Sequence, residues 1–177
     1  MKHLNEYIIE KLKINSNTKS FNYYPKTQKE LRKILEERLK KDKNANLNDI
    51  DVSEIIDMRF LFEGLDPHDI DISEWDVSKV KYMGRMFSYC INLNSDLSKW
   101  DVSNVEDMYH MFEKCKNFNS DLSEWNVSKV KDMKYMFYEC KKFNCDLSYW
   151  YISNVEHMNF MFYNCDSLKN IPSWYNE

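Results

Sequence analysis

Cysteine is the residue type in this chain best suited to metal or redox chemistry, and four of its five copies recur every 25 residues. Cys90, Cys115, Cys140 and Cys165 form the series, and Cys145 lies outside it. A zinc or redox site needs two or more ligands that converge on one point, usually from close pairs such as C-x-x-C. Each recurring Cys falls instead in an apolar series, where a free thiol behaves as a small hydrophobic residue. We therefore predict buried, reduced thiols, with a metal ladder or a redox site as the alternative.

Two polar series recur with the same spacing. They are Asp71, Asp96, Asp121 and Asp146, and Ser78, Ser103, Ser128 and Ser153. Stacked carboxylates could share calcium ions, but calcium-binding repeats carry several acids and glycines per unit, and this series supplies one Asp and no Gly. We predict that each Asp accepts backbone N–H groups in a turn, and that each Ser hydroxyl caps a short helix.

The four histidines, His3, His68, His110 and His157, share no arrangement with a nucleophile, and none has a second His four residues away. No catalytic, cofactor-binding or metal-ligating residue is predicted, and the chain is not expected to be an enzyme.

All these positions are set by a repeat of 25 residues. Residues 96–118 read D-L-S-K-W-D-V-S-N-V-E-D-M-Y-H-M-F-E-K-C-K-N-F, and residues 121–143 repeat the pattern. Trp75, Trp100, Trp125 and Trp150 keep the spacing without an insertion. A fixed period of this size predicts a solenoid, in which each unit completes its core only by packing on its neighbours.

Within one unit, the apolar pattern predicts a strand followed by a short helix. Trp100 and Val102 would point to one side of the strand and Asp101 to the other. The helix would bury an apolar stripe at i, i+3, i+6, i+7 and i+10, formed by Val105, Met108, Met111, Phe112 and Cys115. The predicted fold class is α/β, a leucine-rich-repeat-like solenoid of about five 25-residue coils.

Residues 1–45 are predicted to form a helical N-terminal cap, and residues 46–177 the repeats, with a truncated last coil. Residues 1–14 have the spacing of a short amphipathic helix. Thr27 and Glu30 fit a capping box that starts a second helix at about residues 28–41. Its buried stripe would be Leu31, Ile34, Leu35 and Leu39.

Charge is divided unevenly between these two parts. Residues 1–45 carry 12 Lys and Arg against 6 Asp and Glu, a net charge of +6, and residues 46–177 carry 13 against 23, a net charge of −10. No apolar run approaches the roughly 20 residues of a membrane helix, and the N-terminus has acids where a signal peptide would be apolar. We expect a cytoplasmic protein with no membrane span.

The motif W-D-V-S-x-V-x-x-M-x-x-M-F-x-x-C-x-x-F-N-x-D-L-S-x-W resembles the BspA-like leucine-rich repeat family, whose repeats of about 25 residues occur in bacterial and mycoplasma surface proteins. The matching copies run from residue 51 to residue 164. The resemblance implies a repeat solenoid that binds other macromolecules and has no catalytic centre.

A protein partner is therefore expected, with direct nucleic-acid binding disfavoured and the oligomeric state left open. The residues free to specify a partner are those that vary between copies at outward strand positions. They are Glu74, Asp76, Lys99, Asp101, Glu124, Asn126, Tyr149 and Tyr151. A second candidate row lies on the predicted helix, at Arg59, Phe60, Arg85, Tyr109, His110, Lys134, Tyr135, Asn159 and Phe160.

An alternative function uses the negative charge of residues 46–177. An acidic surface could cover a basic channel, and charge complementarity would accelerate association at low salt. The alternative is an intracellular inhibitor of a basic nucleic-acid-handling enzyme, of the kind encoded by phages or mobile elements.

Overall fold

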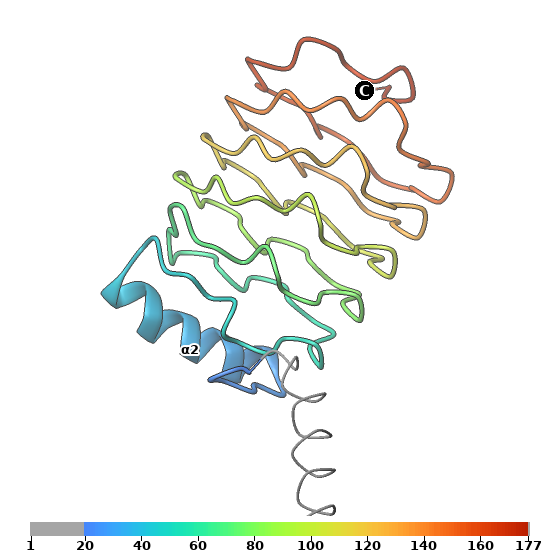
Figure 1. Cartoon of the computed structure of the whole chain (residues 1–177). Coiled ribbons are helices and arrows are strands. Elements are labelled where there is room, and N and C mark those ends of the chain that lie inside the picture. Colours follow the sequence, from blue (N-terminus) through green and yellow to red (C-terminus); the bar gives the residue numbers. More distant parts are fainter. Residues whose placement is uncertain (1–19, 177) are drawn as a thin grey trace, which may run out of the picture.

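A computed structural model describes residues 20–176, and one helix, α2 (Gln28–Lys41), lies within them (Figure 1). The Thr27 hydroxyl accepts the N–H of Glu30 at 3.2 Å, and the Glu30 carboxylate accepts the N–H of Lys26 at 2.8 Å. These bonds satisfy N–H groups that the first helical turn leaves free. Leu31, Leu35 and Leu39 are buried, whereas Ile34, which was predicted to share their face, is only partly buried. The predicted helix at about 28–41 is confirmed, and the one predicted for residues 1–14 lies outside the described residues.

Each 25-residue repeat is a succession of tight turns. In the third copy the turns are closed by hydrogen bonds of 2.9–3.2 Å from the N–H of one residue to the carbonyl three residues earlier. The pairs so joined are Leu97–Trp100, Val102–Val105, Met108–Met111, Phe112–Cys115 and Cys115–Phe118. All these residues are at most 4% exposed. The apolar residues therefore mark the ends of turns, and the polar residues between them face outward.

The predicted α/β fold class is wrong, and so is the leucine-rich-repeat solenoid that went with it. Strand pairing is confined to isolated parallel bridges such as Asp57–Tyr82 and Tyr82–Asp107, and within residues 46–176 there is no α-helix. Positive φ angles at His110 (52°) and Lys114 (60°) interrupt the segment predicted as helical. A residue in the left-handed region cannot continue a right-handed helix. The predicted alternation of buried and exposed side chains is nevertheless present, because Trp100 and Val102 are buried and Asp101 is exposed.

Successive repeats are joined by a backbone ladder and by further single bonds, such as the one from Lys131 N–H to Glu106 O at 2.9 Å. We call residues 58–64, 83–89, 108–114, 133–139 and 158–164 the ladder segments. In the first four segments, alternate N–H groups donate to carbonyls 24 residues later, in or directly before the next segment. In the third copy the donors Met108, His110, Phe112 and Lys114 lie 2.7–2.9 Å from their acceptors. Equivalent residues of neighbouring repeats therefore lie side by side (Figure 1).

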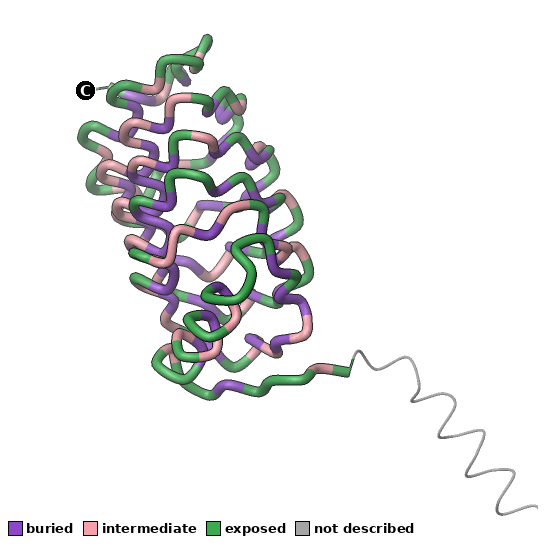
Figure 2. The backbone as a smooth tube through the Cα atoms, turned by 90° about the vertical axis from the view of Figure 1, so that its left-hand side faces the viewer, coloured by how far each residue is buried: buried purple, intermediate pink, exposed green. Residues whose placement is uncertain are grey.

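Side chains reinforce the same register in the core. The indole N–H groups of Trp75, Trp100, Trp125 and Trp150 each donate to a carbonyl 28 residues earlier at 3.0 Å. The phenylalanine rings of successive ladder segments stack with centroids 5.0–5.8 Å apart. Buried residues line the inside of the array along its length, with exposed ones at its rim (Figure 2). The leucines of α2 extend this core at its N-terminal end.

Candidate functional site

All eight residues predicted to contact a partner are exposed, and we call the surface they share the turn face. Its largest side chains are the most exposed, with 89% of Tyr149 and 64% of Tyr151 accessible to solvent. Trp150 between them is 4% exposed and hydrogen-bonded to Leu122 O. On the turn face, each pair of variable exposed residues therefore flanks a buried Trp that is the same in every repeat.

Several side chains of this face also hold the turns together. Oδ1 of Asp76, Asp101 and Asn126 accepts the N–H of the Ser two residues later at 3.0–3.1 Å. Bonds from the Ser103 hydroxyl and N–H lower the pKa of Asp101, because they favour its charged form. Tyr151 occupies the same position in the last repeat and offers no such acceptor.

The Asp series predicted to serve in turns does so. The carboxylates of Asp71, Asp96, Asp121 and Asp146 accept the N–H of the Ser two residues later at 2.9–3.2 Å. The helix-capping role predicted for the serines is wrong, because residues 79–176 contain no helix. The Ser78 hydroxyl instead donates to Asp76 at 2.6 Å.

The second candidate row lies on the ladder segments rather than on helices. Here the ring of His110 stacks on Tyr135 with centroids 4.6 Å apart, and Tyr135 stacks on Phe160 at 5.2 Å. Tyr138 and Tyr163 form a parallel column at 5.2 Å. The sequence interpretation omitted these last two, although they vary between copies and could have been found by that criterion.

Side chains on the ladder segments largely contact one another or the residues directly before each segment. The ring of Tyr109 covers Gly84 so closely that a Cβ there would lie 2.1 Å from it. The guanidinium of Arg59 lies over the Tyr82 ring at 5.1 Å and pairs with Asp57 at 2.6 Å. Such contacts position these groups against the array, so the turn face leaves its tyrosines freer to meet a partner.

One cluster on the ladder segments joins residue types used in hydrolases. The nearly buried Glu113 carboxylate contacts His110 Nδ1 at 2.8 Å and accepts the Ser88 hydroxyl at 3.1 Å. Both partners bind the same oxygen, Oε2, and no hydrogen bond joins the serine to the histidine. Activation of a nucleophile requires that bond, so the cluster does not form a catalytic triad.

Three of the four recurring cysteines are buried as predicted, whereas Cys165 is only partly buried. Cys90, Cys115 and Cys140 are 0% exposed, and each Sγ lies 2.9–3.4 Å from a carbonyl of the preceding repeat. Burial raises the pKa of Cys115 and Cys140 well above the ordinary thiol value. The half-buried Cys145 has its pKa raised to about 11, also by burial. Within residues 20–176 no group of three or more His, Cys, Asp and Glu side chains could hold a metal ion.

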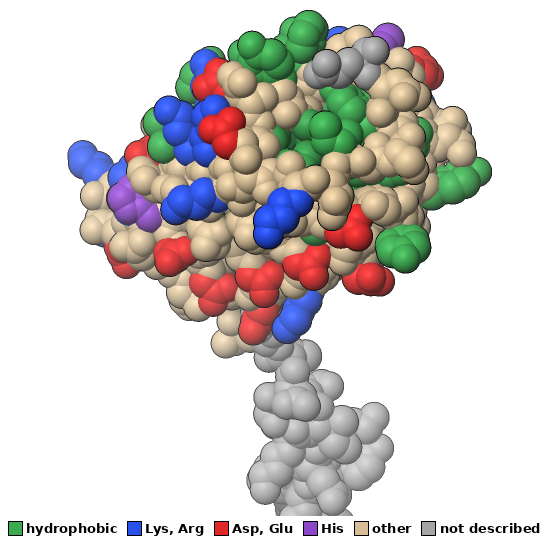
Figure 3. Space-filling view, turned by 90° about the horizontal axis from the view of Figure 1, so that it is seen from above, with side chains coloured by type: hydrophobic (Ala, Val, Ile, Leu, Met, Phe, Trp, Pro, Cys, Tyr) green, Lys and Arg blue, Asp and Glu red, His purple; other side chains and the backbone are tan. Residues whose placement is uncertain are grey.

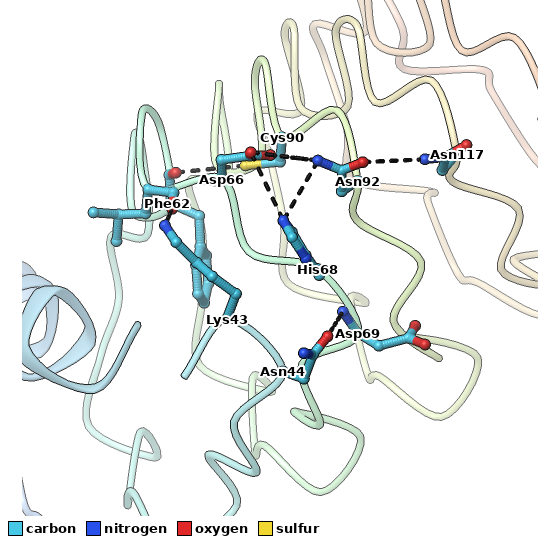
Figure 4. Close-up of polar contacts among 10 residues, drawn as sticks. Lys43, Asn44, Phe62, Asp66, His68, Asp69, Cys90, Asn92 and Asn117 are labelled. Carbon is cyan, nitrogen blue, oxygen red and sulfur yellow. Dashed lines mark hydrogen bonds and ion pairs between the residues drawn. The ribbon is translucent and has the colours of Figure 1, made fainter. Parts of the chain in front are cut away.

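His68 lies in a polar cluster formed by residues of successive repeats (Figure 4). Asn92 Nδ2 is 3.4 Å from Asp66 and 3.5 Å from His68 Nε2, and Asn117 Nδ2 is 3.5 Å from Asn92. These contacts lie at or beyond the long end of the hydrogen-bond range and connect successive repeats. The neighbouring Cys90 thiol is bonded to Phe62 O at 3.4 Å, so the cluster serves to align the array (Figure 4).

The fold and these surfaces define a repeat protein with a fixed buried core and variable exposed positions. The chain belongs to the family described as "Mycoplasma protein of unknown function, DUF285", which matches residues 29–130 and 99–177. No curated protein and no solved structure matches the chain. Across residues 20–176, no helix has the length and apolar character needed to cross a membrane.

Proposed function

We propose that this chain is a non-enzymatic protein-binding module and that the turn face holds the partner. The observation that carries the proposal is the exposure of Tyr149 (89%) and Tyr151 (64%) on either side of the buried Trp150. Tyrosine is enriched among residues that dominate protein–protein binding energy. A folded protein that leaves two such rings in water offers anchors for another molecule.

The rigidity of the turn face supports the same function. Each variable side chain extends from a turn whose backbone is held by hydrogen bonds within the repeat, such as Trp150 N–H to Leu147 O at 3.1 Å. A surface ordered before binding loses less conformational entropy when the partner arrives. The array therefore supports variation at outward positions while the core stays constant.

The experiment compares wild-type protein with the Tyr149→Ala/Tyr151→Ala double variant. A partner is first captured from the host and identified by mass spectrometry, and its binding is then measured by calorimetry with purified proteins. Anchors of this kind are worth about 2 kcal/mol or more, so affinity should fall about thirtyfold. The control is Tyr89→Ala, which removes a 46%-exposed tyrosine from a ladder segment. Equal loss in both variants, or loss only in the control, would contradict the turn face as the site.

A second candidate function is inhibition of a basic nucleic-acid-handling enzyme. The supporting observation is that Glu74, Asp76, Asp101 and Glu124 are all exposed on the turn face beside the aspartate series. Binding through these carboxylates would weaken steeply as salt screens the charges. Affinity that does not change between low and physiological salt would favour the tyrosine anchors and exclude this mode.

We also propose that the chain is related to the BspA-like surface-protein repeats and that the protein is located in the cytoplasm. The family match supports the first through its Mycoplasma membership.

A further inference from the structure

Asparagine side chains join the repeats along a line of their own. The Oδ1 atom of one residue accepts the backbone N–H of the residue 25 positions later, at 2.9–3.3 Å. Each amide oxygen therefore satisfies a backbone donor of the next repeat. We call this series the asparagine ladder, and its bonds join Asn44 to Asp69, Asn94 to Asn119, Asn119 to Asn144 and Asn144 to Lys169.

The asparagine ladder is interrupted between Asp69 and Asn94. Asp69 stands where the next three copies have asparagine, and Figure 4 shows its carboxylate extending away from Asn44. Within residues 20–176, this carboxylate accepts no hydrogen bond and joins no ion pair. Among the same residues, the backbone N–H and the Nδ2 of Asn94 donate to no acceptor, although the equivalent N–H of Asn119 is bonded. The interruption therefore leaves an exposed charged acceptor and, in the neighbouring repeat, two kinds of donor.

A cavity of about 340 Å³ opens at this interruption, and both residues line it. All seven side chains of its wall are polar: four asparagines together with His68, Asp69 and Lys142. A volume of this size suits a small molecule, but small-molecule sites are usually lined mostly by apolar side chains. A ligand of this cavity must therefore present polar groups on most of its surface.

The amides on the cavity wall are held only loosely by the protein. Asn92 Nδ2 lies 3.4 Å from the nearer oxygen of Asp66, and Asn117 Nδ2 lies 3.5 Å from Asn92 Oδ1. Bonds of this length are weak, so a ligand can replace them with shorter ones at little cost. The wall therefore offers both donors and acceptors to an incoming molecule.

The charge at the cavity is balanced, unlike the charge elsewhere on the surface. Figure 3 shows acidic side chains gathered along one edge of the array. The cavity has one carboxylate, Asp69, and one ammonium group, Lys142, among neutral amides and His68. Such a lining has no charge excess that would attract a phosphate or a polyamine, so it favours a neutral ligand. Hydroxyl groups fit it, because each one can donate to a carboxylate and accept from an amide.

We propose that this cavity binds a neutral carbohydrate the size of a monosaccharide or disaccharide. Neighbouring hydroxyl groups of the sugar would donate to the Asp69 carboxylate in a charge-assisted bond and accept from the N–H groups of Asn94 and Asn92. The sugar thereby bridges two repeats at the place where the asparagine ladder is interrupted. These residues are not those of the turn face, so neither proposal depends on the other.

Sugar binding is measured with ¹⁵N-labelled full-length protein, titrated with glucose, galactose, N-acetylglucosamine, lactose and maltose while backbone amide shifts are followed. We expect at least one sugar to shift the amides of Asp69, Asn94 and Asn117 with a dissociation constant in the millimolar range. Tighter binding of a disaccharide than of its units would identify a glycan chain as the ligand, and equal binding a free sugar. Inorganic phosphate and spermidine, added separately, should leave these amides unshifted. No shift at the highest soluble sugar concentration, shifts confined to other residues, or larger shifts with phosphate or spermidine would overturn the proposal.

Two variants show whether the groups of the cavity wall make the bonds. Asp69→Asn keeps the shape of the side chain, removes its charge and introduces the residue that the next copies carry. Loss of the charge-assisted bond should weaken sugar binding at least tenfold. Asn92→Ala removes a neutral donor whose contacts within the protein are long, and it should weaken binding about fivefold.

The matched control is Asp101→Asn, which makes the same change on the turn face, where Asn126 already accepts the equivalent Ser N–H. It should leave sugar binding unchanged, and amide spectra of all three variants show whether the fold is kept. Unchanged affinity in Asp69→Asn, or an equal loss in the control, would contradict the assignment of the site.

Discussion

Replacing Arg32 by Met tests whether the carbonyls of the first ladder segment depend on the hydrogen-bond donor that α2 supplies. The side chain is 26% exposed, and its Nη1 contacts three carbonyls at 2.9–3.0 Å. One nitrogen carries two hydrogens, so two good bonds can form at a time. A hydrogen bond to a charged group contributes about 1.5–3 kcal/mol when buried, and partial exposure reduces this. We expect Arg32→Met to lower the free energy of unfolding by about 2–3 kcal/mol.

Two controls isolate the carbonyl contacts. Arg32 also pairs with Glu36 at 2.8 Å, and Glu36→Gln removes that pair alone at a cost of about 0.3–0.5 kcal/mol. Lys33→Met makes a similar change at an exposed position of the same helix. Urea unfolding followed by circular dichroism gives the three values, and hydrogen exchange locates the loss. If Arg32→Met costs no more than Lys33→Met, or if exchange in the first repeat is unaltered, the capping argument fails.

Three further predictions concern the core and its ionisable groups. Trp125→Ala removes a ring that is 4% exposed and its bond to Leu97 O, and should cost about 3–5 kcal/mol in urea unfolding; wild-type stability would show that the ring does not support the array. Because burial raises the thiol pKa values, Cys115 and Cys140 should resist a thiol reagent at pH 8 in the folded protein and react only after unfolding; rapid native labelling would contradict their burial. The pKa of Asp107 is raised chiefly by burial, so its carboxyl favours folding when protonated and loses that contribution as pH rises through the folded pKa. Asp107→Asn should therefore raise the urea midpoint at pH 7, with the gain shrinking toward pH 3; a gain that does not depend on pH would assign the effect to another cause.

The helix α2 could be predicted from the sequence because several local signals agree there. Thr27 and Glu30 mark its start, and three leucines at helical spacing give one buried face. The repeats could not be assigned in the same way, because their apolar residues at i and i+3 fit a helix and a chain of turns equally well. The left-handed residues that decide the matter are of ordinary types, such as His110 and Lys114. Such residues adopt this region only when the surrounding structure holds them there, and that information is not local.

The exposure of the turn-face residues follows from alternation about Trp75, Trp100, Trp125 and Trp150, and it was predictable without the correct secondary structure. The direction of the hydrogen bonds between ladder segments could not be predicted, because it depends on which way each N–H points between repeats. The cover that Arg32 gives to carbonyls about 30 residues away has no signature in either segment. A charged side chain in a helix is normally read as solvated, and only packing shows otherwise.

Tyr151 offers the sharpest test of whether the turn face was shaped by function. At this position the four earlier copies have Asp51, Asp76, Asp101 and Asn126, and each accepts the N–H of the Ser two residues later. Tyr151 forgoes that bond and exposes its ring. A residue that breaks a local rule without a structural gain points to a functional position. Tyr151→Asp should therefore supply the missing acceptor for the Ser153 N–H and raise stability by about 0.5–1.5 kcal/mol, while weakening partner binding at least tenfold. Stability is measured by urea unfolding and affinity by calorimetry. A variant that is more stable and still binds as wild type would show that the exposed ring serves no partner.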